Sequence, residues 1–568
     1  MTTAPTTADS AEAAVQERIA RLEFDLAGLD DPGNPLGAQQ FLAADERRQL
    51  LPAAERLLDA FGLNAEFVPR ELGGRLDRLD ALARVLRAVF RRDAALGLGY
   101  GLTSFLAAVA VWTGGSTAQR RHTADLLLAG HRMACAYPEP PQGNAFLRNR
   151  LTARSDTGGY RLTGRKEAVN NAAGARALVL FAPGPEGPSA FLAPGVGTGD
   201  GLTLLPRRTT AGVRGCVIQG LAFDGWRLAD DALLGPAGTG LAQAEAVFPL
   251  TRGAGLSMAL GCADTALRTA TAFARSRHAR SSASLHTAST RAALVHAFAD
   301  LLVCDCLSLV ATRAPHLLPA ESRTLGAVAK YLLPTVLNDM MDDLSIVLGV
   351  EAYAGGGSYG TFRKIARDLP MIGLGSAGTS ASRTEIVAQL LRVPSLAPAG
   401  DPDRLAALFR PFDAALPPWT TGGTAADCDS LLDSVARTAE AAAGECGQAL
   451  AEAAGILAVQ ARLLREACAE LTAGPADRPI SARAYALADR YALVVAGAAC
   501  LGVWRHRPGS GFLSAPAWAA MALTRVACRL DKSAARRLSA GADELLTELL
   551  HRFDDARSYD LYATALGR

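Results

Sequence analysis

The residues of this sequence best suited to touch a ligand form one polar run, Lys166-Glu167-Ala168-Val169-Asn170-Asn171. An asparagine amide can donate hydrogen bonds, so this run can hold the polar edge of a bound molecule. The run also contains one of only four lysines in the chain, at positions 166, 330, 364 and 532. The alternative for Asn170 is an ordinary turn residue, because asparagine is common in turns.

The polar run lies between two segments with strand patterns. Tyr160 and Leu162 alternate with other residues before it, and residues 177–182 form a short apolar run after it. Runs of this length and pattern are typical of β-strands. We therefore expect the polar run to form an elbow where two strands meet.

Longer patterns predict a mostly α-helical protein with a central β domain. Residues 40–132 have helical periodicity, the next hundred break into short alternating runs with Gly and Pro, and long helical patterns return after residue 240. A linker with Pro and Gly follows at 392–404. The predicted regions are an N-terminal helical domain (1–132), a β domain (133–235), a helical bundle (240–392) and a C-terminal all-helical extension (405–568).

Composition excludes several classes of function. The net charge is only +2, and no basic run with interleaved aromatic residues occurs, so we expect no nucleic-acid partner. The ten cysteines include no CxxC pair, which argues against a zinc or other metal site and against a disulfide framework, and favours a reducing cytoplasm. The first twenty residues lack a basic start followed by an apolar block, so we expect no secretion signal.

The longest apolar run is short for a membrane helix. It extends from Tyr491 to Trp504, about fourteen residues, whereas a transmembrane helix needs roughly twenty. We therefore expect a buried helix at this position and no membrane span.

Five local patterns, in order, resemble the acyl-CoA dehydrogenase family. They are ELGGRLDRLDAL (71–82), ACAYPEPPQGNAF (134–146), YRLTGRKEAVNNA (160–172), FARSRHARSSASL (273–285) and the set LGVEAYAGGG, RKIARDLP and SAGTS (348–380). The resemblance covers about residues 70–392 and implies an acyl-CoA dehydrogenase-like fold. The helical extension resembles the one found in long-chain members of the family.

The resemblance implies an FAD cofactor and an acyl thioester substrate. In the family, a glutamate removes the α proton while the β hydrogen leaves as hydride to the flavin. By position in the matched motifs, FAD contacts are implied for Tyr137, Gly143, Asn144, Asn170, Arg277, Gly349 and Thr379, and a place beside the acyl group for Arg252. Arg277 matches an arginine that reaches a neighbouring subunit's FAD, which implies a homo-oligomer, a dimer or a tetramer.

Several positions depart from the family pattern. Pro138 replaces a threonine of the flavin loop, Ala168 replaces the stacking tryptophan, and Ile346 replaces a glutamine. The glycine turn reads Gly349-Val350, and Arg280-Ser281 replaces a Phe-Gly pair. Losing a ring contact and two polar contacts predicts weaker FAD binding than in ordinary members.

The family's catalytic glutamate has no counterpart in the sequence. Alignment of Gly378-Thr379 places Ala377 at the glutamate position with Ser376 beside it, and the alternative base position, before Arg252, is Thr251. A methyl group or a neutral hydroxyl cannot take the proton. The substitute bases to consider are Glu245 and Glu351, and then His278 and His286, while Arg367-Asp368 is interpreted as a structural pair.

Three hypotheses for function remain open at this point. The leading one is a divergent flavoprotein of acyl-CoA dehydrogenase type, acting on a thioester of CoA or acyl carrier protein. The second is a non-catalytic partner subunit that pairs with a homologue, or an acyl- or carrier-binding protein on the same fold. The third is a different reaction on this fold, such as elimination, hydration or heteroatom oxidation.

Overall fold

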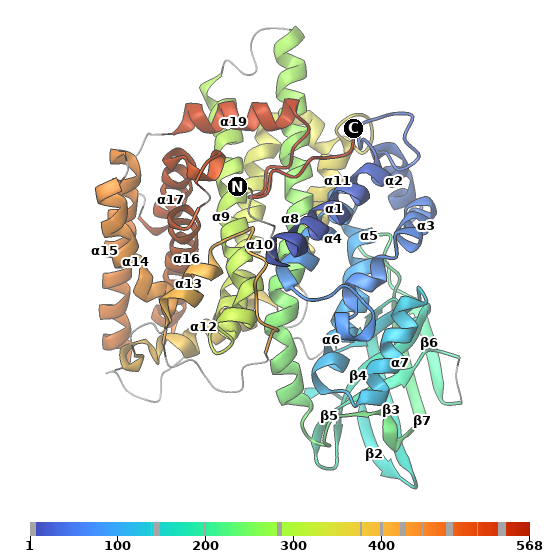
Figure 1. Cartoon of the computed structure of the whole chain (residues 1–568). Coiled ribbons are helices and arrows are strands. Elements are labelled where there is room, and N and C mark those ends of the chain that lie inside the picture. The colour runs from blue at the N-terminus through green and yellow to red at the C-terminus, as the bar shows by residue number, and fades with distance from the viewer. Residues whose placement is uncertain are drawn as a thin grey trace.

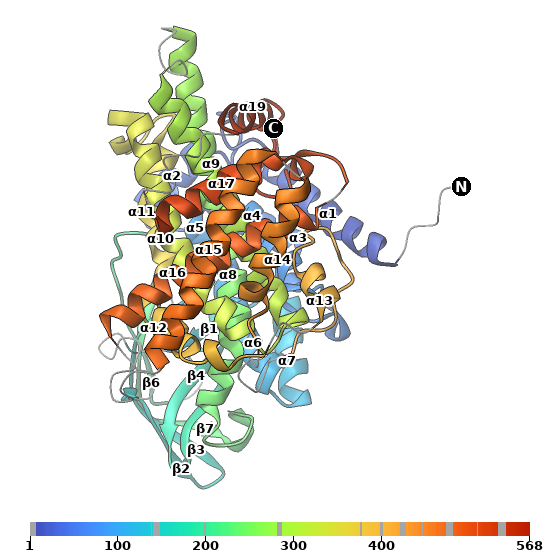
Figure 2. The ribbon, with the colours of Figure 1, turned by 90° about the vertical axis from the view of Figure 1, so that its left-hand side faces the viewer.

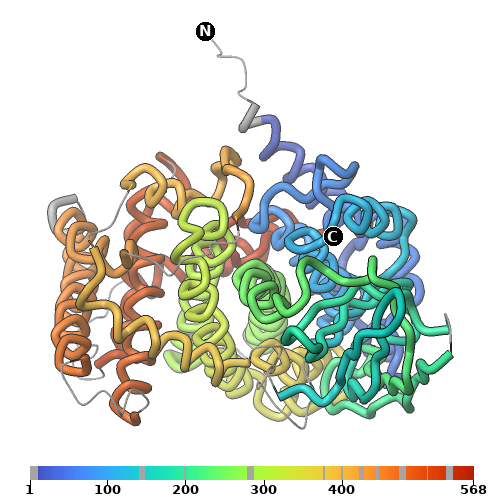
Figure 3. Tube along the Cα trace, turned by 90° about the horizontal axis from the view of Figure 1, so that it is seen from below, coloured from blue at the N-terminus to red at the C-terminus, as the bar shows by residue number. Residues whose placement is uncertain are grey.

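The protein has three helical parts and one β domain (Figure 1). The computed structural model describes residues 7–137, 139, 148–197, 200–280, 287–374, 378–397, 401–420, 428–445, 447–472, 481–507, 509–531 and 541–568. A long helical bundle stands between the N-terminal helices and the C-terminal extension, and the β domain lies on the N-terminal side of the bundle (Figure 3). The predicted fold class, mostly α with a central β domain and extra C-terminal helices, is confirmed.

The N-terminal helices surround α4, which is buried along its whole length. The elements of this part are α1 (Thr7–Leu26), α2 (Ala38–Glu46), α3 (Pro52–Phe61), η1 (Leu63–Phe67), η2 (Arg70–Leu72), α4 (Leu79–Arg92), α5 (Ala94–Leu96), the π-helical turn η3 (Gly97–Leu102), α6 (Thr103–Gly114) and α7 (Thr117–Leu128). The apolar periodicity places Leu79, Leu82 and Leu86 in the core. Leu76, which continues the pattern in the sequence, lies ahead of the helix and pairs with Pro69.

The β domain consists of two four-stranded sheets. Its strands are β1 (Arg132–Ala136), β2 (Thr152–Asp156), β3 (Gly159–Asn170), β4 (Ala175–Gly184), β5 (Gly187–Pro194), β6 (Leu202–Arg207), β7 (Ile218–Ala229) and β8 (Leu233–Leu234), with the short turn η6 (Asp230–Ala232). The sheet orders are β1-β4-β5-β8 and β2-β3-β7-β6, and the β1–β4 pair is parallel. Buried side chains from both sheets, among them Leu180, Phe191 and Trp226, form a common core, as expected for packed sheets.

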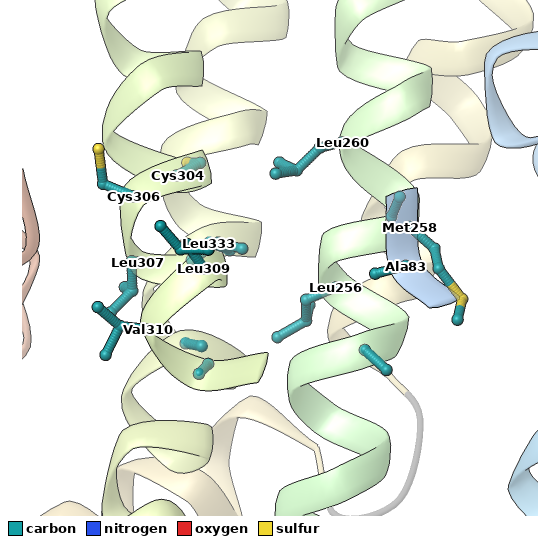
Figure 4. Close-up of a cluster of buried hydrophobic side chains, with 14 of the residues drawn as sticks. Ala83, Leu256, Met258, Leu260, Cys304, Cys306, Leu307, Leu309, Val310 and Leu333 are labelled. Carbon is teal, nitrogen blue, oxygen red and sulfur yellow. The ribbon is translucent and has the colours of Figure 1, made fainter. Parts of the chain in front are cut away.

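The bundle brings α8, α9 and α10 together around a continuous apolar core. Its elements are α8 (Gly240–Arg280), α9 (Ala288–Leu317), α10 (Ser322–Leu348), η7 (Gly349–Tyr353), α11 (Gly360–Asp368), η8 (Leu369–Gly373) and α12 (Thr379–Leu390). Leu256 and Leu260 of α8 point toward α9, while Met258 on another face of α8 lies beside Ala83 of α4 (Figure 4). A Cβ atom on Gly261 would lie 2.5 Å from the Arg87 carbonyl oxygen, so this glycine permits the close approach of α8 and α4.

The C-terminal extension packs against α9, α10 and α12 of the bundle (Figure 2). Its elements are η9 (Val393–Ser395), α13 (Pro402–Leu408), α14 (Ser430–Glu445), α15 (Gln448–Thr472), α16 (Ala482–Arg505), η10 (Phe512–Ser514), α17 (Pro516–Leu530) and α19 (Ala542–Asp554). Asp300 of α9 accepts two hydrogen bonds from Arg525 of α17, at 2.9 and 2.7 Å. Buried ion pairs of this kind link the extension to the bundle.

Three described helical segments are long and apolar enough to cross a membrane, at residues 94–114, 288–317 and 482–505. Between 78% and 89% of each apolar window is buried inside the protein. The run from Tyr491 to Trp504 lies in α16, and both of these aromatic residues are buried. The prediction of a buried helix at this position is confirmed.

Candidate active site

The polar run at the end of β3 attaches the β domain to the N-terminal helices. The Asn170 Nδ2 atom donates to the Thr103 hydroxyl at 2.7 Å, and Asn171 Nδ2 donates to the Gly99 carbonyl at 2.5 Å. Asn171 has a φ of +63°, a left-handed conformation that asparagine tolerates better than most residues. The elbow therefore contacts the π-helical turn η3 and the start of α6.

One atom of this elbow lacks a partner. The Asn170 Oδ1 atom is buried and accepts no hydrogen bond from the described residues. The Thr103 hydroxyl donates its single hydrogen to the Leu98 carbonyl, at 2.8 Å, so it can only accept from Asn170. This assigns the amide nitrogen of Asn170 to Thr103 and leaves the amide oxygen free. A buried acceptor without a donor is costly, so the site suits a ligand that carries an N–H group.

Lys166, in the same run, makes contacts that hold the β domain together. Its side chain is completely buried, and Nζ lies 3.0 Å from the Tyr137 carbonyl oxygen and 3.4 Å from Glu139 Oε1. Burial lowers the pKa of Lys166 to about 8, although Glu139 opposes the shift. Glu139 also accepts hydrogen bonds from the backbone N–H groups of Arg150 and Leu151. Lys166 thus ties β3 to the end of β1.

An aromatic group connects the β domain to α8. The ring of Tyr137 stacks on Phe181 with centroids 4.2 Å apart, and its centroid lies 6.2 Å from that of Phe248 on α8. The Arg252 guanidinium lies over the Phe248 ring, 5.0 Å from its centroid. Burial raises the pKa of Tyr137, so its hydroxyl stays neutral. These contacts form an apolar wall between the sheet and the bundle.

Arg252 is a buried cation with one of its donors unused. Its Nη1 atom donates to Glu385 Oε2 at 2.7 Å, whereas Nε has no partner among the described residues. Glu385 also accepts a 2.5 Å hydrogen bond from Arg323, so one carboxylate serves two arginines. The preceding residue, Thr251, donates to the Val247 carbonyl of its own helix at 3.2 Å. Its neutral hydroxyl is therefore already engaged, as is common for threonine within helices.

A second buried cation, Lys330 of α10, lies in the neighbourhood of Arg252. Its Nζ atom donates to the Ile372 carbonyl in η8 at 2.5 Å, and among the described residues no carboxylate contributes to its electrostatic environment. Burial and, to a smaller extent, the positive charge of Arg252 lower the pKa of Lys330 to about 8. Sequence reasoning did not select Lys330 as a site residue. The available signal was its occurrence as a single lysine in an otherwise apolar helical stretch.

Two of the expected FAD residues lie near the far end of the bundle. Arg277 is exposed near the end of α8, with its guanidinium 5.5 Å from the Phe273 ring centroid. Gly349 is exposed between α10 and η7, with a φ of +58°. At 1.5 Å per residue, Arg277 lies roughly 38 Å along α8 from Arg252. One chain therefore does not bring Arg277 to the Tyr137–Arg252 region.

The remaining expected residues are placed as follows. Thr379 begins α12 and is half-buried, and Gly378 before it is buried. Glu245 lies within α8 and pairs with Arg323 at 3.3 Å, and Glu351 is half-buried in η7. Arg367 and Asp368 form the anticipated ion pair at 2.8 Å. The positions outside the described residues are Pro138, Gly143, Asn144, Ser281, His286, Ser376 and Ala377, and the side chains of His278 and Arg280 are also not described.

The sequence matches known acyl-CoA dehydrogenases. Residues 238–391 match the family model "Acyl-CoA dehydrogenase, C-terminal domain". The human mitochondrial short-chain specific acyl-CoA dehydrogenase is 33% identical over 242 residues, which cover 41% of this chain and 58% of that protein. A probable acyl-CoA dehydrogenase of Mycobacterium leprae is 26% identical over 238 residues, covering 41% of this chain and 61% of that protein. The chain thus matches less than two thirds of the length of these relatives.

Solved structures support the same fold over more of the chain. An acyl-CoA dehydrogenase complexed with FAD from Bacillus anthracis superimposes with a TM-score of 0.73 at 15% identity, covering 96% of this chain and 95% of that one. The prolyl acyl carrier protein oxidase AnaB has a TM-score of 0.59 at 19% identity, covering 68% of this chain and 100% of that one. Residues 238–391 thus match the acyl-CoA dehydrogenase C-terminal domain, and the chain carries the acyl-CoA dehydrogenase fold with a helical extension beyond it.

Proposed function

We propose that this protein is an FAD-dependent oxidoreductase that acts on an acyl thioester of CoA or of an acyl carrier protein. The observation that carries the proposal is the unbonded, buried Oδ1 atom of Asn170, an acceptor placed where the β domain meets the helices. An isoalloxazine ring has N–H groups that fit such an acceptor, and a bound FAD would supply the hydride acceptor of the reaction.

The chain's own residues have separable tasks in this proposal. Asn170 orients the ring edge by accepting a hydrogen bond. Tyr137, Phe181 and Phe248 exclude water between the sheet and α8, which strengthens electrostatic interactions inside the site. Arg252 and Lys330 provide a positive environment for the thioester carbonyl, where negative charge develops as the α proton leaves.

The carrier of the acyl group is either CoA or an acyl carrier protein, and both remain open. The curated relatives are named as acyl-CoA dehydrogenases, whereas AnaB is named as an oxidase of a prolyl acyl carrier protein. The described residues contain no feature that selects one carrier over the other. We therefore include both carriers in the experiment.

We also propose that the protein forms a homodimer through the bundle. Three large apolar side chains at the end of α10 and in η7 are strongly exposed, namely Ile346 (78%), Val350 (82%) and Tyr353 (78%). Exposed apolar groups of this kind often mark an interface between chains. Arg277 is remote from its own Tyr137–Arg252 region and would instead serve the FAD of a second copy.

We also propose a cytoplasmic location, because the ten cysteines include no CxxC pair.

A second candidate function is a non-catalytic partner subunit or an acyl-binding protein. One feature of the sequence favours this second function: Ala377 and Thr251 occupy the two positions where the family carries a base. A protein of this kind would have no need of FAD. Flavin content after purification therefore separates the two candidates.

The test is reconstitution with excess FAD followed by anaerobic mixing with saturated acyl thioesters. A panel of acyl-CoAs and the same acyl groups on an acyl carrier protein should be compared. We expect the visible absorbance of oxidised flavin to decrease with at least one substrate. A protein that binds no FAD under these conditions would contradict the proposal and support the partner-subunit function.

A further inference from the structure

We infer that a cavity in the C-terminal extension is a second ligand site, which binds an aliphatic molecule with an anionic head group. The cavity lies between α14 and α15 and has a volume of about 460 Å³, within the usual range for sites that hold small molecules. These two helices lie on the opposite side of the bundle from the β domain (Figure 1). The inference therefore concerns a different part of the chain from the proposed active site, and it does not depend on the proposed function.

The apolar part of the cavity comes from α14, α15 and the residues that follow η9. Its side chains are those of Leu396, Leu432, Ala436, Ala458 and Ala461. Leu432 and Ala461 are buried, so the cavity reaches the packed core of the extension. No aromatic side chain is among the described residues that line it, so the apolar surface suits an aliphatic chain better than a planar ring.

The polar part of the cavity is cationic. Arg437 of α14 and both Arg462 and Arg465 of α15 line it, and each of these side chains is exposed or half-buried. Asp433 is the one carboxylate among the described lining residues, so those residues carry two positive charges in excess. A guanidinium binds a carboxylate or a phosphate through two parallel hydrogen bonds. The excess charge therefore predicts an anionic ligand.

The spacing of the lining residues directs the positive charge and the apolar surface into the same space. On α15, Ala458, Ala461, Arg462 and Arg465 are separated by three, four and seven residues from the first, a spacing that places them on one side of the helix. The third side of the cavity includes Ala397, which is held by a β-bridge to Cys428 just before α14. A bound molecule would thus contact alanine and arginine side chains at the same time.

Two of the three arginines are available to a ligand. Arg465 forms an ion pair with Asp433 of the facing helix. Arg462 pairs with Glu466 at 2.7 Å, but both side chains are more than half exposed, and exposed pairs of this kind contribute little stability. Arg437 is exposed, and it has no ion-pair partner in the part of the chain that the structure describes. Arg437 and Arg462 can therefore bind an anion at little cost.

The chemistry that satisfies both parts is an aliphatic chain that ends in a carboxylate or in a phosphate monoester. The chain would lie against Leu432 and Ala458, and the head group would lie between Arg437 and Arg462. A small inorganic anion would leave the apolar surface exposed to water. A neutral alcohol of the same chain length would leave the arginines without an anion. These two incomplete ligands are therefore the controls for the complete one.

Isothermal titration calorimetry of the full chain tests the inference. The probes are decanoate, decyl phosphate, decan-1-ol and inorganic phosphate, each used below the concentration at which it aggregates. We expect one molecule of decanoate or of decyl phosphate to bind per chain, and decan-1-ol and inorganic phosphate to bind at least about tenfold more weakly. Binding of decanoate alone would assign the head group as a carboxylate, and binding of decyl phosphate alone would assign it as a phosphate ester.

A variant of the head-group position shows where the ligand binds. Arg437→Gln should weaken binding about tenfold, because it removes a hydrogen bond between two charged groups. The matched control is Arg483→Gln, an exposed arginine of the same extension that pairs with Glu470 and does not line the cavity. This control should bind the probes like wild type.

A second variant tests the apolar part. Ala458→Leu places a larger side chain in the cavity and should also weaken binding about tenfold. Ala469→Leu makes the same change at an exposed position of α15 outside the cavity lining and should have no effect. Melting temperatures of all four variants report whether each of them folds, and Arg437→Gln alters only an exposed side chain.

Three results would overturn the inference. The first is that neither decanoate nor decyl phosphate binds. The second is that decan-1-ol or inorganic phosphate binds as tightly as the complete ligands, because the cavity would then recognise only one of the two features. The third is that Arg437→Gln or Ala458→Leu, once shown to be folded, binds both complete ligands like wild type. Flavin content and bleaching test the proposed function separately, so either proposal can fail while the other stands.

Discussion

The carboxylate of Glu321 accepts two hydrogen bonds from Ser430, at 2.8 Å from its backbone nitrogen and 2.6 Å from its hydroxyl. Glu321 lies in the turn between α9 and α10, and Ser430 begins α14, so this contact joins the bundle to the extension. Next to it, Asp429 is buried and accepts a 2.6 Å hydrogen bond from Tyr491. Two buried carboxylates thus lie at this junction, and the hydrogen bonds described for them come from uncharged donors.

The first prediction is that the junction weakens as the pH rises. Burial raises the pKa of Glu321 to about 7, so the folded protein favours the protonated carboxyl. Its contribution to stability is complete below the ordinary value of 4.5 and is lost as the pH rises through about 7. The size of this shift corresponds to roughly 3 kcal/mol. Melting temperatures between pH 5 and pH 8 should fall more for wild type than for Glu321→Gln. Equal slopes for the two proteins would contradict this prediction.

The second prediction concerns the C-terminal residues that follow α19. Asp560 is buried and lies 3.0 Å from Arg91 and 3.2 Å from Arg87, both on α4. Asp560→Asn removes a negative charge that neutralises two buried arginines. We therefore expect a loss of about 3–5 kcal/mol in unfolding free energy. Chemical denaturation measures it. The matched control is Asp554→Asn, whose exposed pair with Arg275 should contribute less than about 1 kcal/mol.

Lowering the pH should reproduce part of the destabilisation expected for Asp560→Asn. The neighbouring arginines Arg91 and Arg87 lower the pKa of Asp560 to about 2, against the effect of burial. Its stabilising contribution is therefore present above the ordinary value of 3.8 and is lost as the pH falls toward 2. The stability difference between wild type and Asp560→Asn should shrink over that range. A difference that stays constant would show that Asp560 does not act through its charge.

The third prediction concerns FAD affinity. Asn170→Ala removes the unbonded amide oxygen, and one hydrogen bond contributes about 1 kcal/mol, so FAD should bind roughly fivefold more weakly. Quenching of flavin fluorescence measures the affinity. The control is Asn171→Gly, which loses the neighbouring bond to Gly99 but tolerates the φ of +63°. If both variants bind FAD like wild type, Asn170 does not contact the cofactor.

The fourth prediction concerns assembly. Light scattering at micromolar concentration should report at least a dimer for wild type. Val350→Glu places a charge on the exposed apolar side chains of α10 and η7, so it should shift the protein toward the monomer. Val459→Glu, at a 47% exposed position on α15, is the control and should leave the mass unchanged. A monomeric wild type would refute the proposed interface and the role of Arg277 in a second copy.

The sequence determined the order of the helical and β parts. Helical periodicity before residue 132 and after 240, and alternation between them, reflect local backbone preferences that a sequence pattern records directly. The predicted elbow over residues 166–171 was partly wrong, because residues 166–170 continue strand β3 and the turn to β4 occupies residues 171–174. The absence of a glutamate at positions 376–377 is likewise a property of the sequence alone.

Only the tertiary structure decided which charges meet. Lys330 and Ile372 are 42 residues apart, and Arg87 and Asp560 are 473 apart, so no local pattern links them. The burial that lowers the pKa of Lys330 and raises that of Glu321 comes from helices that pack together only in the folded chain. Electrostatic energies depend on distance in space and on exclusion of water, and neither quantity is encoded at a single position. The sequence therefore indicated which residue types the site contains, and the fold decided which buried charges meet.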